Sequence, residues 1–140
     1  YCLVYKELVP PESLVKVPFI KYQTDASVAN IIETWCAEHF DEPPSVAMDV
    51  NSMSTCRHFV RAGLGWSILT YMGLGSCKDK DIYVSPLRSK NGEYITRDTN
   101  MVYTKDSENL IVVKTFIEYV RNYYKEHTVV DNSILREYKS

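Results

Sequence analysis

Residues 50–69 read VNSMSTCRHFVRAGLGWSIL, and they predict a strand end, a helix and a second strand in that order. Residues 46–50 come first and predict a strand, and Asn51-Ser52 then offers short polar side chains that can cap a helix. The helix that follows has apolar side chains at helical spacing, namely Met53, Cys56, Phe59 and Val60. It ends at Gly63-Leu64-Gly65, where glycine can adopt a left-handed backbone conformation. Residues 66–71 predict the next strand.

The same alternation of strands and helices extends in both directions along the chain. Before this stretch, residues 3–5 and 17–22 predict strands, and Thr24-Asp25 predicts the start of a helix with an apolar face of Val28, Ile31, Ile32, Trp35, Cys36 and Phe40. After it, residues 82–87 and 96–105 predict strands, with a turn at Asn91-Gly92. Asp106-Ser107 predicts the cap of a last helix, whose apolar face would be Val113, Phe116, Ile117, Val120 and Tyr124. Alternating strands and helices predict an α/β layered fold with a largely parallel sheet.

Composition excludes several classes of protein. The 140 residues are enough for one domain, or one domain and a small piece, and the 45% of hydrophobic residues can form a core. The net charge of −2 leaves no basic surplus for phosphates, so we expect no direct contact between this chain and DNA. The apolar runs are too short to cross a bilayer. The four cysteines, Cys2, Cys36, Cys56 and Cys77, are widely spaced, as is typical of reduced thiols in a cytoplasmic protein.

The two strand-to-helix junctions are the candidate binding sites. They lie at Tyr22-Gln23-Thr24-Asp25 and at Val50-Asn51-Ser52. In α/β sheets ligands bind at the carboxyl ends of strands, where the free N–H groups of a helix start attract anions. The competing interpretation is that these residues only cap their helices, because every helix start needs a cap.

The residues that could carry catalysis or bind a metal do not form a persuasive pattern. Cys36, His39, Cys56 and His58 could assemble a zinc site, but their spacing is unlike that of known fingers, and both cysteines fall on apolar helix faces. Gly63-x-Gly65 follows a helix and precedes a strand, the reverse of a phosphate-binding loop. The acidic residues Glu33, Glu38, Asp41 and Glu42 are typical of a solvated face. We therefore predict no catalytic residue, no metal ligand, no cofactor and no enzymatic activity.

Residues 50–69 resemble the LysR-type transcriptional regulators, in which a Ser-capped helix runs through an Ala-Gly-Leu-Gly turn into an apolar strand. Residues 12–25 resemble the entry to that family's second regulatory subdomain, and residues 96–124 resemble its return strand and closing helix. The resemblance implies a three-layer α/β fold like that of the type 2 periplasmic binding proteins. The chain would hold one subdomain, at residues 17–94, with a crossover strand and linker at 1–16. Residues 95–126 would be the C-terminal strand and helix of the other subdomain, and 127–140 a polar tail.

The resemblance also implies partners and site residues. A small-molecule effector, a carboxylate or an amino-acid-like metabolite, would contact Gln23, Thr24 and Asp25, with Tyr22 beside them. Asp25 would favour an effector that carries an amine. The helix that starts at Met53 resembles the one used for dimer contacts, so Met53, Phe59 and Arg61 are candidate interface residues of a homodimer or tetramer. DNA would be bound only by a winged helix-turn-helix located before Tyr1, in a cytoplasmic protein.

Two alternatives remain open from the sequence. The first is a solute-binding lobe of an exported protein with the same fold. The second is an enzyme of this fold, or a metal protein that uses Cys36, His39, Cys56 and His58.

Overall fold

The computed structural model describes residues 1–7, 9–74 and 81–127, and within it the chain divides into two compact units. Unit 1 comprises residues 1–96, and unit 2 begins at Arg97. The predictions for Cys77 and for most of the tail at 127–140 lie outside the described residues.

The strands of unit 1 form one mixed sheet. They are β1 (Cys2–Tyr5), β2 (Phe19–Tyr22), β3 (Val46–Val50), β4 (Ser67–Leu69) and β5 (Tyr83–Pro86). β1 pairs antiparallel with β4 and with β5, whereas β2 pairs in parallel with β3. Two hydrogen bonds join the β4-β1-β5 group to the β2-β3 pair. The Ile20 amide donates to the Trp66 carbonyl (2.8 Å), and the Trp66 amide donates to the Pro18 carbonyl (3.0 Å). The order in the described part of unit 1 is therefore β3-β2-β4-β1-β5.

The prediction of a largely parallel sheet holds for the strand directions, because β2, β3, β4 and β5 all run the same way, whereas β1 runs against its two neighbours. Residues 1–16, predicted as a crossover strand and linker, contain this strand, which lies between β4 and β5, and the short 3₁₀ helix η1 (Pro11–Lys16). β1 precedes both of its neighbours by more than sixty residues, so the alternation of strands and helices along the chain carries no information about its direction. The predicted strands at 3–5, 17–22, 46–50, 66–71 and 82–87 all exist, several of them slightly shorter.

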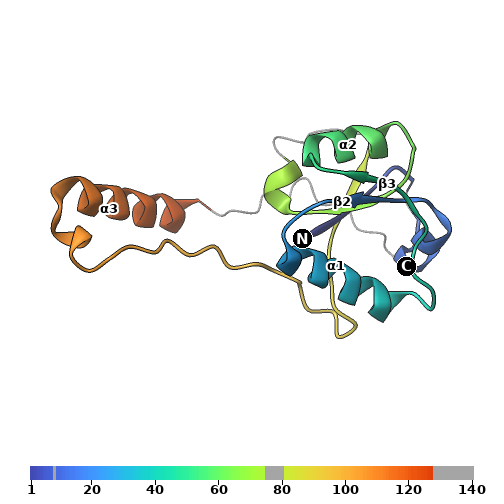
Figure 1. Ribbon diagram of the computed structural model, residues 1–140, viewed down its shortest axis with the longest axis horizontal. Coiled ribbons are helices and arrows are strands. Elements are labelled where there is room, and N and C mark those ends of the chain that lie inside the picture. Colours follow the sequence, from blue (N-terminus) through green and yellow to red (C-terminus); the bar gives the residue numbers. More distant parts are fainter. Residues whose placement is uncertain (8, 75–80, 128–140) are drawn as a thin grey trace. The chain divides into compact units, whose positions relative to one another are not determined.

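The sheet is covered by a helix on each face (Figure 1). Helix α1 (Ala26–His39) covers one face and helix α2 (Met53–Arg61) covers the other. The α1-face core contains Leu3, Tyr5, Leu14, Phe19, Val28, Ile32, Trp35, Cys36, Phe40, Trp66, Ile68 and Leu87. The α2-face core contains Cys2, Val4, Ile20, Val50, Cys56, Val60, Leu69, Leu74, Ile82 and Val84. Neighbouring residues of one strand enter opposite cores because side chains alternate across a sheet.

The predicted helix ends are confirmed in unit 1. Asp25 and Ser52 are the N-caps of α1 and α2. After α2, Gly63 has a φ of +78°, the left-handed conformation expected of a helix stop. Gly92 has a φ of +82° in the predicted turn, where its amide donates to the Ser89 carbonyl at 2.9 Å. A further 3₁₀ helix, η2 (Tyr71–Leu74), follows β4.

Unit 2 consists of an extended segment, a 3₁₀ turn η3 (Ser107–Asn109) and helix α3 (Ile111–Glu126). Residues 96–104, which fall in the strand predicted at 96–105, pair with no strand of the described chain. The predicted cap at Asp106-Ser107 is wrong, because α3 begins four residues later with Leu110 at its N-cap position. The Ser107 hydroxyl instead donates to the Thr104 carbonyl at 2.8 Å, inside the turn.

Candidate functional site

The carboxyl ends of three strands meet at one edge of the unit 1 sheet. Tyr22 and Val50, the last residues of β2 and β3, pair in parallel register, and the Gln23 amide continues the pairing to the Val50 carbonyl at 2.7 Å. β4 runs parallel to β2, so Thr70 lies at the same edge. We call residues 22–25, 51–53 and 70–71 the carboxyl edge. Ligands of α/β sheets bind at edges of this kind.

The Asp25 side chain is the N-cap of α1. Its Oδ1 atom accepts hydrogen bonds from the Ser27 amide (3.1 Å), the Val28 amide (3.1 Å) and the Ser27 hydroxyl (2.6 Å). The carboxylate therefore caps the helix and opposes the positive end of its dipole. A second anion at this helix start would be repelled by Asp25, whereas a cation would be attracted.

The side chains of Gln23 and Thr24, unlike that of Asp25, make no hydrogen bond with the described residues. Gln23 is exposed and Thr24 is half-buried. Tyr22 is half-buried and packs against the α2-face core. Of the four predicted effector residues, Asp25 caps α1 and the Tyr22 ring is partly packed against the core. The side chains of Gln23 and Thr24 are available to a ligand.

The second junction contributes a neutral helix start. The Ser52 hydroxyl oxygen accepts a hydrogen bond from the Thr55 amide at 3.3 Å, and the first turn of α2 has no acidic residue. This end of α2 is electrostatically more favourable to an anion than the start of α1 is.

Sequence reasoning did not single out Thr70, which the fold brings to the carboxyl edge. Its hydroxyl donates to Met53 Sδ at 3.4 Å and accepts from the Gly73 amide at 3.3 Å. A threonine near the end of the predicted strand at 66–71 was the available signal, but the position of β4 beside β2 depends on pairings that are distant in sequence.

The three candidate interface residues on α2 are not equivalent. Met53 is half-buried against η2, where a Cβ atom on Gly73 would come 2.0 Å from Met53 Sδ. Phe59 is half-buried against the α2-face core. Arg61 is exposed, and its carbonyl accepts a hydrogen bond from Lys6 Nζ at 2.7 Å. Arg61 is therefore the residue of the three that lies most openly on the surface.

The residues of the alternative zinc site are not brought together. Cys36 lies in the α1-face core and Cys56 in the α2-face core, on opposite sides of the sheet. His39 stacks on Trp35 with its Nδ1 2.9 Å from the Trp35 carbonyl, and His58 Nδ1 lies 2.7 Å from the Ser54 carbonyl. Within residues 1–7, 9–74 and 81–127, no three His, Cys, Asp or Glu side chains are grouped as metal ligands.

Burial also affects the reactivity of the thiols. It raises the pKa of Cys2 and Cys56, and burial together with the Glu33 carboxylate raises the pKa of Cys36 to about 11. The thiolate is the nucleophilic form of cysteine, so these three side chains are poor nucleophiles near neutral pH.

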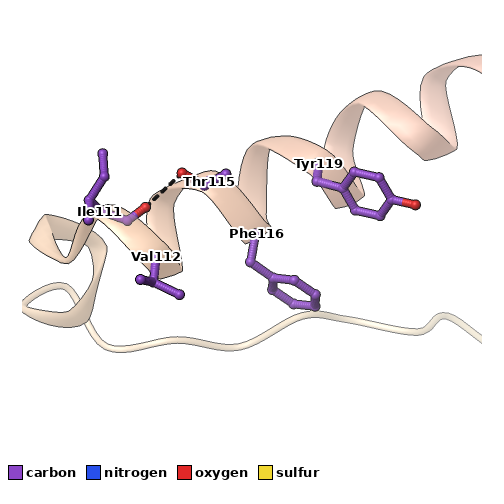
Figure 2. Close-up of a pocket in the computed structure, with 5 residues that line it drawn as sticks. All are labelled: Ile111, Val112, Thr115, Phe116 and Tyr119. Atoms are coloured by element: carbon purple, nitrogen blue, oxygen red, sulfur yellow. Dashed lines mark hydrogen bonds between the residues drawn. The ribbon is translucent and has the colours of Figure 1, made fainter.

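Helix α3 carries an open apolar hollow of about 460 Å³, lined by Ile111, Val112, Thr115, Phe116 and Tyr119. Figure 2 shows that all five side chains belong to the same helix, and that Val112 and Phe116 project from it together. Val112 is 76% exposed and Phe116 is 59% exposed. One helix cannot enclose a small molecule, so we interpret this α3 apolar face as a packing surface and not as an effector pocket.

The described helices include none that is long and apolar enough to span a membrane.

Comparison with known proteins relates nearly all of the chain to one family. The family profile described as the LysR substrate binding domain matches residues 2–125. An uncharacterised HTH-type transcriptional regulator of Bacillus subtilis (strain 168), YraN, is 34% identical over 119 residues, which are 85% of this chain and 40% of YraN. A second such regulator of the same strain, YkuM, is 27% identical over 105 residues, which are 75% of this chain and 35% of YkuM. The chain thus spans well under half the length of either relative.

Proposed function

This chain belongs to the LysR substrate binding domain family, whose α/β fold is that of the periplasmic binding proteins, and we propose that it senses a small-molecule effector for a transcription regulator. Family membership indicates a non-enzymatic role for the domain. The observation that supports sensing best is the carboxyl edge, where two strand-to-helix junctions lie together beside the available side chains of Gln23 and Thr24.

The two ends of the 1–96 segment support the location of this site. The main-chain nitrogen of Tyr1 donates to the Ile95 carbonyl at 3.1 Å, and the Leu87 amide donates to the Tyr1 carbonyl at 2.9 Å. Cys2 pairs with Leu69, the last residue of β4, so Tyr1 and Ile95 both lie at the carboxyl edge. We propose that a ligand bound at this edge, near the boundary of unit 1 at Arg97, biases one arrangement of the units over another.

The charges at the two junctions favour an amino-acid-like effector. Asp25 can attract an ammonium group, whereas the α2 start, capped by neutral Ser52, can accept a carboxylate. A simple carboxylate could use only the second junction. The conservative variant Asp25→Asn separates these cases, because asparagine is also a good cap but carries no charge.

The effector site is tested by thermal-shift screening of the full-length protein with amino acids and small carboxylates. A ligand at 100 times its Kd stabilises a protein by about 2.7 kcal/mol. We expect Gln23→Ala and Thr24→Ala to abolish most of the shift, and Asn30→Ala, an exposed change further along α1, to retain it. A shift that survives both site variants would exclude this location.

We further propose the domain assignment that the resemblance implies. Residues 17–94 are the second regulatory subdomain, residues 1–16 cross into it, and residues 95–126 return to the first subdomain. The rest of the first subdomain and a winged helix-turn-helix that binds DNA belong to the part of the protein outside this chain, in a cytoplasmic regulator. The exposed α3 apolar face supports this assignment, because such faces are normally covered.

We propose that α2 takes part in a homodimer or tetramer through Met53, Phe59 and Arg61. Among these, Arg61 offers the clearest test because it is exposed and its replacement leaves the core intact. We expect Arg61→Glu to lower the mass measured by light scattering, while Glu38→Arg, an exposed charge reversal on α1, leaves the mass unchanged. An unchanged mass for Arg61→Glu would remove α2 from the interface.

A further inference from the structure

We propose that the hairpin at residues 88–94, attached to α1 by Trp35, transmits displacements of α1 to the point where the chain leaves unit 1. The inference rests on the proposed function, because α1 begins at the proposed effector site. It assigns to Trp35, Arg88 and Tyr94 a positioning role, at a distance from any effector.

The first part of this connection is the attachment of the hairpin to α1. Trp35 is 2% exposed, and its ring packs edge-on against Phe40 and Trp66, with centroids 5.6 Å and 6.5 Å away. Its indole Nε1 donates to the Arg88 carbonyl at 2.7 Å. Because the ring is closely packed in the α1-face core, a shift of α1 moves the donor that holds Arg88.

The second part is the closure of the hairpin by the Arg88 side chain. Its Nη1 donates to the Gly92 carbonyl and its Nη2 to the Tyr94 hydroxyl, both at 2.9 Å. The guanidinium carbon also lies 4.1 Å from the Tyr94 ring centroid. The main chains of Arg88 and Tyr94 form a bridge. These contacts join the two arms of the hairpin, so that the arms move together.

The third part is the exit from unit 1. Directly after the hairpin, the Ile95 amide donates to the Leu87 carbonyl at 2.9 Å, and the Ile95 carbonyl accepts from Tyr1. Unit 2 begins two residues later, at Arg97. Asp25 and Trp35 are ten residues apart, about 15 Å along a rigid helix. A movement at the start of α1 therefore reaches the exit through one helix, one indole hydrogen bond and one closed hairpin.

A mutant cycle on the full-length protein tests this coupling without an effector. Asp25→Ala removes the cap of α1, Trp35→Phe removes the indole donor, and hydrogen–deuterium exchange at the Ile95 amide is the readout. We expect Asp25→Ala to accelerate this exchange about threefold in the wild-type background, and to have no effect in the Trp35→Phe background. Equal acceleration in both backgrounds would overturn the proposal.

A second variant covers the case in which Trp35→Phe fails to fold. Arg88→Gln combined with Tyr94→Phe removes the guanidinium and hydroxyl contacts between the hairpin arms, while the main-chain bridge and the buried core remain, and Lys90→Ala is the matched hairpin control. We expect the Arg88/Tyr94 variant to abolish the response of Ile95 to Asp25→Ala, and Lys90→Ala to preserve it. If the Arg88/Tyr94 variant kept the response of Ile95 and Lys90→Ala abolished it, the closed hairpin would be excluded as the connection between α1 and Ile95. These exchange measurements need no ligand, so a failed effector screen would not contradict the proposed coupling. Conversely, if the effects of the substitutions on exchange were simply additive, the proposed effector site would be unaffected.

Discussion

Gly65 approaches Pro18 so closely that a Cβ atom on Gly65 would lie 2.3 Å from the Pro18 carbonyl oxygen. The same carbonyl accepts the Trp66 amide, one of the hydrogen bonds that join β4 to β2. The absence of a side chain at Gly65 thus allows the two parts of the sheet to meet.

Gly65→Ala should therefore be strongly destabilising, with a loss of about 3 kcal/mol or more in the free energy of unfolding. Gly63→Ala is the matched control, because Gly63 has a positive φ but its nearest neighbour, Lys6 Cδ, lies 3.8 Å from an added Cβ. Its loss should be about 1 kcal/mol from backbone strain alone. Denaturant unfolding measures both values, and equal losses would show that the contact with Pro18 is unimportant.

Asp25→Ala should lower the free energy of unfolding by about 1 kcal/mol, because two amides of the first turn of α1 lose their acceptor. Asp25→Asn should restore most of this loss. Urea titration followed by circular dichroism provides the measurement. A loss that asparagine does not reduce would mean that the charge of Asp25, and not its cap, stabilises the fold.

The stability of the protein should fall in alkaline solution because of Cys36. Burial, assisted by Glu33, raises the pKa of this thiol from 9.0 to about 11 in the folded state. Because the pKa of Cys36 is higher in the folded state than in the unfolded state, this thiol stabilises the fold when the pH lies below the unfolded-state pKa. This contribution is lost as the pH rises from about 9 to about 11. The loss is on the order of 2 kcal/mol.

Cys36→Ala should remove this component, so the unfolding free energies of the variant and the wild type should converge between pH 9 and pH 11. A constant difference between the two proteins over that range would contradict the assignment.

The α3 apolar face should behave differently in the chain of residues 1–140 and in the full-length protein. In the chain alone, Val112→Ser with Phe116→Ser should reduce the fluorescence of a bound hydrophobic dye, because both side chains are exposed. In the full-length protein the same change should destabilise the fold by about 3 kcal/mol if the rest of the first subdomain covers this face. Lys114→Ser, also exposed on α3, is the control for both measurements.

The parts of the structure that the sequence predicts well are those with local causes. Asp25 can accept hydrogen bonds from amides two and three residues ahead, and Gly63 can take the left-handed conformation wherever the helix stops. The two junctions could be predicted for the same reason. Their arrival at one edge followed from the rule for parallel strands, which holds for β2 and β3.

The parts that the sequence does not predict depend on partners distant in sequence. The central position of β1 comes from pairing with strands that lie sixty and eighty residues later. Residues 101–103 have the composition of a strand, but within residues 97–127 they find no neighbouring strand. Thr70 joins the site only because Trp66 pairs beside Phe19. In each case the deciding contact is absent from any local window of sequence.

One hydrogen bond, from the main-chain nitrogen of Tyr1 to the Ile95 carbonyl, holds the first residue of unit 1 beside the end of its 1–96 segment. Protein units whose two ends lie side by side can be inserted into the loops of other proteins without separating the flanking segments. Unit 1 therefore has the geometry of a transplantable module. A short Gly-Ser linker from Thr96 to Tyr1 should also permit circular permutation, with new termini opened at the exposed Asp41-Glu42 turn after α1.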